Sequence, residues 1–234
     1  FCDQLKNGHS RQAIESLFIR EQYGHRVITP RVRSILPWLI LFDDEVRHKV
    51  LMIAPEIAVE GGDAAHLPFV ERQTILDDIV SRIIKGDGER SARDNSAIAR
   101  IAQPDLSGDT LRLITRYKDN DDAIFFLGRL AWQGEMTLCV PALSEIAIDS
   151  SRGIYARIAS LRAVMTCGTA KQKRDIWRRL AALPATLPRR LLTEILEDAE
   201  ANMGSVESLL VSVEKLEAYE RYETSGLDKA LHGF

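Results

Sequence analysis

Apolar residues recur three and four positions apart along almost the whole of this 234-residue chain. That spacing lines one face of a helix, whereas strands alternate apolar and polar residues, and paired alternating segments are missing here. Aromatic residues, which favour sheets, make up only 6% of the chain. The sequence therefore predicts an all-α fold with essentially no sheet. The expected helices span residues 10–22, 30–42, 43–53, 68–85, 94–102, 107–117, 119–133, 136–148, 152–167, 170–183, 187–201 and 205–222.

The second half of the chain has an internal period. When its helices are paired in order, the second helix of each pair starts at residue 119, 152 or 187, so the spacings are 33 and 35 residues. A fixed period of this size in helical hairpins is typical of α-solenoids. The segment VPALSEIAIDSSRGIYARIASLRAVMTCG has Pro141 in its first helix and an Arg- and Ala-rich second helix, and it resembles a HEAT repeat. We therefore predict a HEAT-like array of helical hairpins over residues 93–234, preceded by a separate helical region over residues 1–92.

The segment 205–222 is expected to be the capping helix of this array. One stripe of it is apolar and the opposite face is rich in glutamate, as the end of a repeat array requires. We expect the tail after Thr224 to be frayed. The residues expected to be buried are Val206, Leu209, Leu210, Val213 and Leu216.

The bulk composition restricts the cellular context. A formal net charge of −3 gives no overall attraction to nucleic acid or to anionic membranes. The three cysteines, Cys2, Cys139 and Cys167, are far apart, which fits reduced thiols in a cytoplasmic protein. No apolar run approaches the roughly 18 residues of a membrane span. The chain does not begin with Met, so we expect it to be part of a longer protein.

The run PWLILFDDEVRHKV invites comparison with a P-loop ATPase, because Asp43 and Asp44 follow four apolar residues as a magnesium-binding acid would. The phosphate-binding pattern GxxxxGK[ST] does not occur in this chain. We interpret residues 30–42 as a helix bent at Pro37, with Asp43 capping the helix that follows. The acidic pair then marks a helix end.

Other candidate chemistry is equally weak. The acidic run 118–122 lacks the spacing of a calcium loop, so Asp119 or Asn120 is expected to cap a helix. The five histidines share no metal-ligand spacing, and no nucleophile motif is present. The sequence therefore predicts no catalytic residue, no metal site and no cofactor.

Basic residues are the remaining candidates for a binding surface. Residues 171–190 hold seven basic side chains and one acid, and Lys171, Arg174 and Arg178 share one helix face. This face is either solvated and paired to the acidic helices that follow, or it binds a phosphate backbone or an acidic partner.

The second helices of the predicted hairpins carry further arginines that could form a ladder along the concave side. Arginine suits this because its planar fork pairs with carboxylate or phosphate. In the alternative interpretation, acids on the next helix, such as Glu145 and Glu194, hold these arginines in place. The ladder candidates are Arg129, Arg157, Arg162 and Arg190.

Residues 30–79 carry a set of short motifs. Pro37-Trp38-Leu39 begins the set, Pro55-Glu56 and Gly62-Asp63 follow, and Arg72 lies in the next helix. This arrangement resembles the helical region that follows the nucleotide-binding module in bacterial NACHT-type STAND NTPases, which continues into α-helical repeats. The resemblance implies an ATPase located upstream. It also implies that this chain is a non-enzymatic sensor, often used in antiphage defence, which recognises a protein trigger or another domain of the same chain.

Two other functions stay open from the sequence. One is a HEAT-like nucleic-acid-binding protein of the DNA repair glycosylase type, although Trp132 and Trp177 are too scattered to indicate its groove. The other is a scaffold adaptor that binds a protein partner. A P-loop in the preceding sequence would decide in favour of the STAND interpretation.

Overall fold

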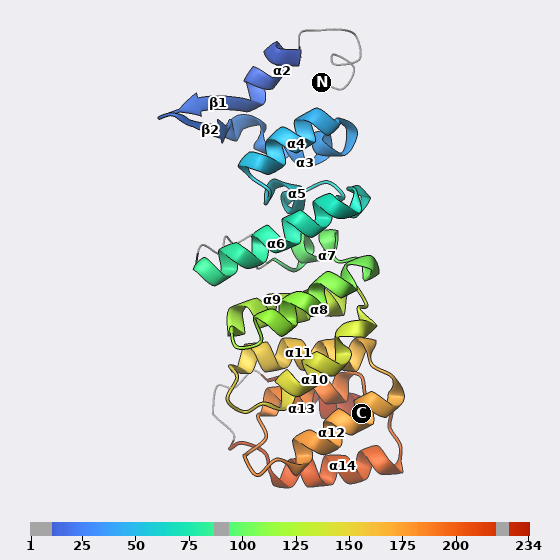
Figure 1. The fold of residues 1–234 in the computed structure, drawn as a ribbon. Helices are drawn as coiled ribbons and strands as arrows, with labels where there is room; N and C mark the ends of the chain where they lie inside the picture. The colour runs from blue at the N-terminus through green and yellow to red at the C-terminus, as the bar shows by residue number, and fades with distance from the viewer. Residues whose placement is uncertain (1–10, 87–93, 219–224) are drawn as a thin grey trace. The chain divides into compact units, whose positions relative to one another are not determined.

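The computed structural model describes residues 11–86, 94–218 and 225–234. Apart from one two-stranded sheet, the regular elements in these ranges are helices, so the prediction of a helical fold is confirmed (Figure 1). Two compact units, Phe1–Ala102 and Gln103–Phe234, make up the chain. None of the described helices is long and apolar enough to cross a membrane.

The N-terminal unit consists of short helices around a small core. Its regular elements are α2 (Arg11–Phe18), β1 (Ile19–Gln22), β2 (His25–Ile28), η1 (Pro30–Ile35), α3 (Leu36–Phe42), α4 (Asp44–Ile53), α5 (Ile57–Glu60), η2 (Ala64–His66), α6 (Phe69–Lys85) and α7 (Asn95–Ile101).

The predicted helix over residues 10–22 is wrong in its second half. The chain leaves α2 at Phe18 and forms an antiparallel hairpin in which Ile19 pairs with Ile28. Tyr23 and Gly24, which join the strands, have φ values of 55° and 78°. Two positive φ values are what the tight turn of a two-residue hairpin requires. The hairpin therefore takes the place of the second half of the predicted helix.

The segment 30–42 also differs from the single bent helix that was predicted. It divides into the 3-10 turn η1 and the α-helix α3, which has Pro37 in its first turn. Proline fits there because its missing N–H would have had no partner inside the helix. Leu36, Leu39 and Ile40 are buried, whereas Ile35 is 40% exposed.

The boundary between the units lies after Ala102, ten residues beyond the predicted end of the first region. The reason is the packing of α7, which contacts α5 and η2. In addition, Arg100 Nη1 donates to the Val59 carbonyl oxygen at 2.8 Å. These contacts attach α7 to the N-terminal unit.

The C-terminal unit is built from consecutive helices joined by short turns. They are η4 (Pro104–Leu106), α8 (Ser107–Arg116), α9 (Asp121–Gln133), η5 (Thr137–Cys139), α10 (Val140–Ile148), α11 (Ile154–Cys167), α12 (Ala170–Ala182), α13 (Arg189–Glu197), α14 (Met203–Glu214) and α15 (Leu227–Gly233). The seven helices predicted over residues 107–222 are all present. Within the acidic run 118–122, the side chain of Asn120 caps α9 by accepting a hydrogen bond from the Ala123 N–H at 2.9 Å.

Alternate helices of this unit contact one another. Helix α10 contacts α8 and α12, and α12 also contacts α14. In the same way α11 contacts α9 and α13, and α13 also contacts α15 (Figure 1). The helices therefore form two rows. Apolar side chains of α11 and α13 are buried, among them Leu161 and Leu196, of which 0% and 4% is exposed.

Helices α9 and α11 approach each other closely at Gly128. A Cβ atom at this position would lie 2.9 Å from the backbone carbon of Ala159 and 3.0 Å from its Cβ. Glycine weakens a helix interior, but here its missing side chain allows the two backbones to come together. Gly128 and Ala159 therefore allow α9 and α11 to pack closely.

The C-terminal end of the chain contradicts two expectations. Helix α14 buries Ser205 and Ser212 and exposes Val206, Leu210 and Val213, three of the five side chains that were expected inside. The tail after Thr224 forms α15, whose Leu227 is 1% exposed, so it is not frayed. Helix α15 contacts α13, which explains its order.

Candidate functional site

The acidic pair at the end of α3 caps a helix. The Asp43 carboxylate accepts a hydrogen bond from the Val46 N–H at 2.9 Å, at the start of α4. Its neighbour Asp44 forms an ion pair with Arg47 at 2.5 Å. The predicted helix end is therefore confirmed.

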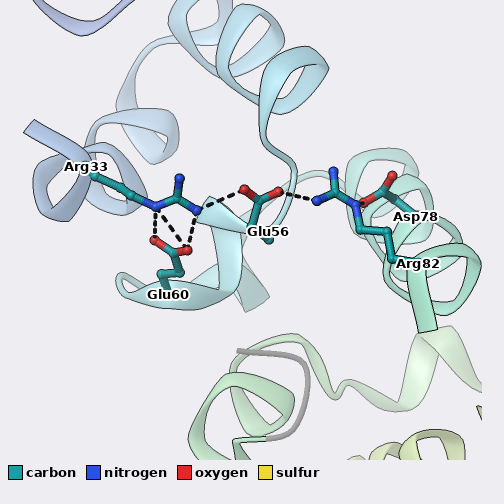
Figure 2. Close-up of polar contacts among 5 residues, drawn as sticks. All are labelled: Arg33, Glu56, Glu60, Asp78 and Arg82. Atoms are coloured by element: carbon teal, nitrogen blue, oxygen red, sulfur yellow. Dashed lines mark hydrogen bonds and ion pairs between the residues drawn. The ribbon is translucent and has the colours of Figure 1, made fainter. Parts of the chain in front are cut away.

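A charged cluster connects three elements of the N-terminal unit (Figure 2). Glu56, which is only 7% exposed, lies between Arg33 of η1 and Arg82 of α6. Its Oε1 is 2.9 Å from Arg33 Nη2, and its Oε2 is 3.1 Å from Arg82 Nη1. Arg33 Nε also donates to Glu60 at 2.8 Å, and Arg82 Nε is 2.7 Å from Asp78. Charges of opposite sign thus alternate along the cluster.

This cluster changes the proton affinities of its members. The hydrogen bond to Glu60 raises the pKa of Arg33 further, so its guanidinium stays charged. Burial raises the pKa of Asp78, and this effect exceeds the opposite influence of Arg82. Every member has an oppositely charged neighbour inside the unit, so the geometry is that of a clamp that holds η1, α5 and α6 together.

The other motif residues of the segment 30–79 also have local structural roles. Gly62 has a φ of +63°, and a Cβ there would lie 2.5 Å from the carbonyl oxygen of Pro37. Asp63 caps η2, and Arg72 Nε donates to the carbonyl oxygen of Leu67 at 3.0 Å. Trp38 is the exception, because 55% of it is exposed. Folding of this segment is enough to explain most of these residue types.

The four predicted ladder arginines lie in different environments. Arg157 is buried and is not part of a surface. It is 6% exposed and its Nε donates to the Ala147 carbonyl oxygen at 3.0 Å. Burial lowers its pKa, although the guanidinium remains protonated at neutral pH. Arg157 therefore joins α11 to the end of α10.

Arg162 is held by an acid on the next helix, as the alternative interpretation expected. Both arms of its guanidinium donate to the Glu194 carboxylate, at 2.6 and 2.5 Å, and the same group lies 4.9 Å from the Trp132 ring centre. The hydrogen bond that Arg162 donates to Glu194 raises the pKa of Arg162. This triplet spans α9, α11 and α13.

Arg129 and Arg190 lie beside a pair of aromatic rings. Arg129 is 5.1 Å from the Phe125 ring centre, and Arg190 is 5.9 Å from that of Tyr155. The two rings meet edge to face at 6.0 Å. Tyr155 is 58% exposed, whereas Phe125, Arg129 and Arg190 are partly buried, so the row runs across α9, α11 and α13 with Tyr155 as its most open member. We call Phe125, Arg129, Tyr155 and Arg190 the arginine–aromatic row.

Arg129 and Arg190 were candidates from the sequence, but Phe125 and Tyr155 were not. A usable signal was present, because Phe125 and Arg129 are four residues apart on one helix and such positions share a face.

The basic residues of α12 form a second surface. Lys171 and Arg174 are exposed, and Arg178 is 3.3 Å from Asp175 of the same helix. Arg179, which was not a candidate, pairs with Glu145 of α10 at 2.8 Å. Glu145 thus holds an arginine in place, but a different one from those predicted.

A cleft of about 250 Å³ lies at the start of α12. Trp177 and Met165 contribute apolar wall. Lys173 and Arg174 line the cleft with positive charge, and Asp198 and Glu200 line it with negative charge. Cys167 ends α11 nearby, and burial raises the pKa of its thiol. A high thiol pKa leaves little thiolate, so this cysteine is a poor nucleophile at neutral pH.

Among residues 11–86, 94–218 and 225–234, no cluster of three His, Cys, Asp or Glu side chains has the geometry to hold a metal ion. Comparison with known protein families finds no match. No curated protein is detectably similar to this chain. No solved structure is detectably similar to it either.

Proposed function

We propose that this chain is a non-catalytic recognition region, in which a HEAT-like array of helical hairpins binds a partner on the face formed by α9, α11 and α13. The observation that carries the proposal is the arginine–aromatic row, which crosses three helices that are alternate in sequence and adjacent in space. Consecutive second helices of such arrays usually provide an extended binding surface.

The chemistry of the row favours an acidic protein segment. Arg190 contacts Tyr155 and has no carboxylate within ion-pair distance among the described residues, so its charge is available to a partner. Tyrosine and arginine side chains are enriched in protein interfaces, because tyrosine offers a large rigid ring and arginine a planar group that pairs with carboxylates. Glu194 already neutralises Arg162 on the same face, which leaves a modest local charge.

In the longer protein that the resemblance implies, this region would be the sensor of a bacterial NACHT-type STAND NTPase. Trigger binding on the α9–α11–α13 face would be relayed to an ATPase located upstream, as part of antiphage defence. The motif residues of the segment 30–79 support the proposal only through their order along the chain.

A second candidate function is binding to single-stranded nucleic acid. Aromatic rings and arginines on one surface can stack bases and pair with phosphates, and Phe125 and Tyr155 supply such rings. We favour the protein partner, since the net charge of the chain is −3 and the row contains only two arginines.

The test compares two fluorescein-labelled probes, a Glu-rich peptide containing Tyr and Leu, and a poly-dT oligonucleotide. Arg190→Glu should abolish peptide binding, whereas Arg178→Glu, on the exposed face of α12, should leave it unchanged. Preferential binding of the oligonucleotide would support the nucleic-acid function instead. If neither probe binds, or both variants weaken the peptide equally, the row is not a binding surface.

A further inference from the structure

Helix α14 presents its apolar side chains to solvent. Met203 is 75% exposed, Leu210 is 63% exposed and Val213 is 46% exposed. Val206 is 39% exposed on the same face. Side chains of this kind normally form the buried face of an amphipathic helix. Here the buried positions are taken by Ser205 and Ser212 instead.

The polar side of α14 is attached through hydrogen bonds. Trp177 Nε1 donates to Ser212 Oγ at 3.0 Å, and Ser212 in turn donates to the Ser208 carbonyl oxygen at 2.7 Å. Ser205 Oγ accepts from the Asn202 N–H at 2.8 Å as part of a capping box. The polar face of α14 therefore packs against the unit. Its apolar face points to solvent and could bind a partner.

The spacing of the stripe identifies the shape that would cover it. Its members follow one another at intervals of three, four and three residues, at positions 203, 206, 210 and 213. This is the a/d pattern of a coiled coil, in which side chains of one helix fit between those of another. A stripe this narrow matches a single helix packed along α14. We call Met203, Val206, Leu210 and Val213 the α14 seam.

The charges beside the seam indicate the charge of the helix that would bind there. Glu207 and Glu214 directly follow the d residues Val206 and Val213, so they take the e positions. Both are exposed. Neither has a cationic partner among the described residues. In coiled coils the e positions select partners by charge, so these two carboxylates favour lysine or arginine opposite them.

A second copy of the chain does not meet this requirement. In an antiparallel pair of α14 helices the glutamates of the two copies would face each other, and like charges at such positions destabilise the pair. In a parallel pair Glu207 would face Asn202 and Glu214 would face Leu209, since these two residues occupy the g positions. Neither arrangement places a cation beside Glu207 or Glu214.

We propose that the α14 seam is a docking site for an amphipathic helix of a partner protein, with apolar residues at its a and d positions and lysine or arginine beside them. This site is separate from the arginine–aromatic row, and it does not depend on the function proposed for that row.

The direct test uses the intact chain and two short synthetic helical peptides labelled with fluorescein. Both have Leu at the a and d positions, and one has Lys at the e and g positions where the other has Glu. Fluorescence anisotropy gives the two dissociation constants. We expect the Lys peptide to bind at least about tenfold more tightly than the Glu peptide, because each of two e-position carboxylates adds a favourable contact.

Substitutions in α14 assign the binding to the seam. Leu210→Asp should weaken the Lys peptide by about tenfold or more, since it places a charge at the centre of the apolar stripe. Val211→Asp is the matched control, because Val211 is 46% exposed but lies off the seam. The pair Glu207→Lys and Glu214→Lys should reverse the preference in favour of the Glu peptide.

Thermal melting of each variant should match that of the parent chain, since the altered side chains are exposed. Equal affinity for both peptides, no binding of either, or equal losses from Leu210→Asp and Val211→Asp would each refute the proposal. Sedimentation velocity tests the remaining alternative, which is a dimer of the chain. A dimer of the parent chain that Leu210→Asp dissociates would show that a second copy occupies the seam.

Discussion

The contact between α9 and α11 at Gly128 allows a quantitative test of the packing. Replacing Gly128 by Ala adds a Cβ atom 2.9 Å from the backbone carbon of Ala159, which cannot move without shifting α11. Overpacking of this kind costs about 1–3 kcal/mol of stability. The same substitution improves helix propensity by about 1 kcal/mol. The expected net effect is a loss of up to about 2 kcal/mol in the free energy of unfolding.

Gly108 provides the matched control. It lies in the first turn of α8, and a Cβ there would meet nothing within 4 Å. Gly108→Ala should therefore leave stability unchanged or raise it by up to about 1 kcal/mol. The two variants are thus expected to differ by about 1–3 kcal/mol, which is the overpacking cost alone.

Urea denaturation followed by tryptophan fluorescence measures this difference. In a Trp38→Phe background the signal comes from Trp132 and Trp177, which both belong to the C-terminal unit. If Gly128→Ala stabilises the chain as much as Gly108→Ala does, the helices do not approach as closely as the structure has them, and the reasoning fails.

Three further predictions concern single side chains. Leu161→Ala should lower the free energy of unfolding by about 2–5 kcal/mol, measured by urea denaturation, because Leu161 is fully buried; a loss below about 1 kcal/mol would contradict its packing. Gly62→Ala should destabilise the N-terminal unit more than Gly86→Ala in thermal melts, since both have positive φ but only Gly62 would bring a Cβ against Pro37; equal losses would leave the contact without effect. Burial raises the pKa of Cys139 to about 12, so in a Cys2→Ser, Cys167→Ser variant this thiol should react slowly with iodoacetamide at pH 8 and rapidly in urea, with equal rates counting against burial. The raised value also means that Cys139 contributes stability that is present below the unfolded thiol pKa and is lost as the pH rises toward 12.

The helical parts of the fold were accessible from the sequence because periodicity and capping residues act locally. The helices over residues 107–201 and the cap at Asp43 depend on neighbours within one or two turns, and both were predicted. The hairpin at residues 19–28 was missed because its turn uses Tyr23-Gly24, and tyrosine rarely adopts positive φ.

The surfaces were less predictable than the helices. Amphipathic periodicity shows that α14 has two different faces, but it assumes that the apolar face is buried, and in this helix Ser212 packs against Trp177 instead. The hydrogen-bond partner of each arginine also depends on residues that are distant in sequence. Arg157 and Arg162 lie five residues apart on α11, yet one bonds a buried carbonyl oxygen and the other a carboxylate on α13.

The hydrogen-bonded attachment of α14 affects how the C-terminal unit opens. A hydrogen bond contributes only about 0.5–1.5 kcal/mol net, since water replaces it when the contact breaks, whereas burial of a leucine contributes about 1.5–3 kcal/mol. Helix α14 is held by Ser212, which accepts from Trp177, and by Lys215, whose Nζ donates to the carbonyl oxygens of Ala181 and Leu183 at 2.7 and 3.0 Å. Its release therefore costs less free energy than that of α11, which is filled with buried apolar side chains. Amide hydrogens of α14 should exchange with solvent through local opening, while those of α11 exchange only when the whole unit unfolds.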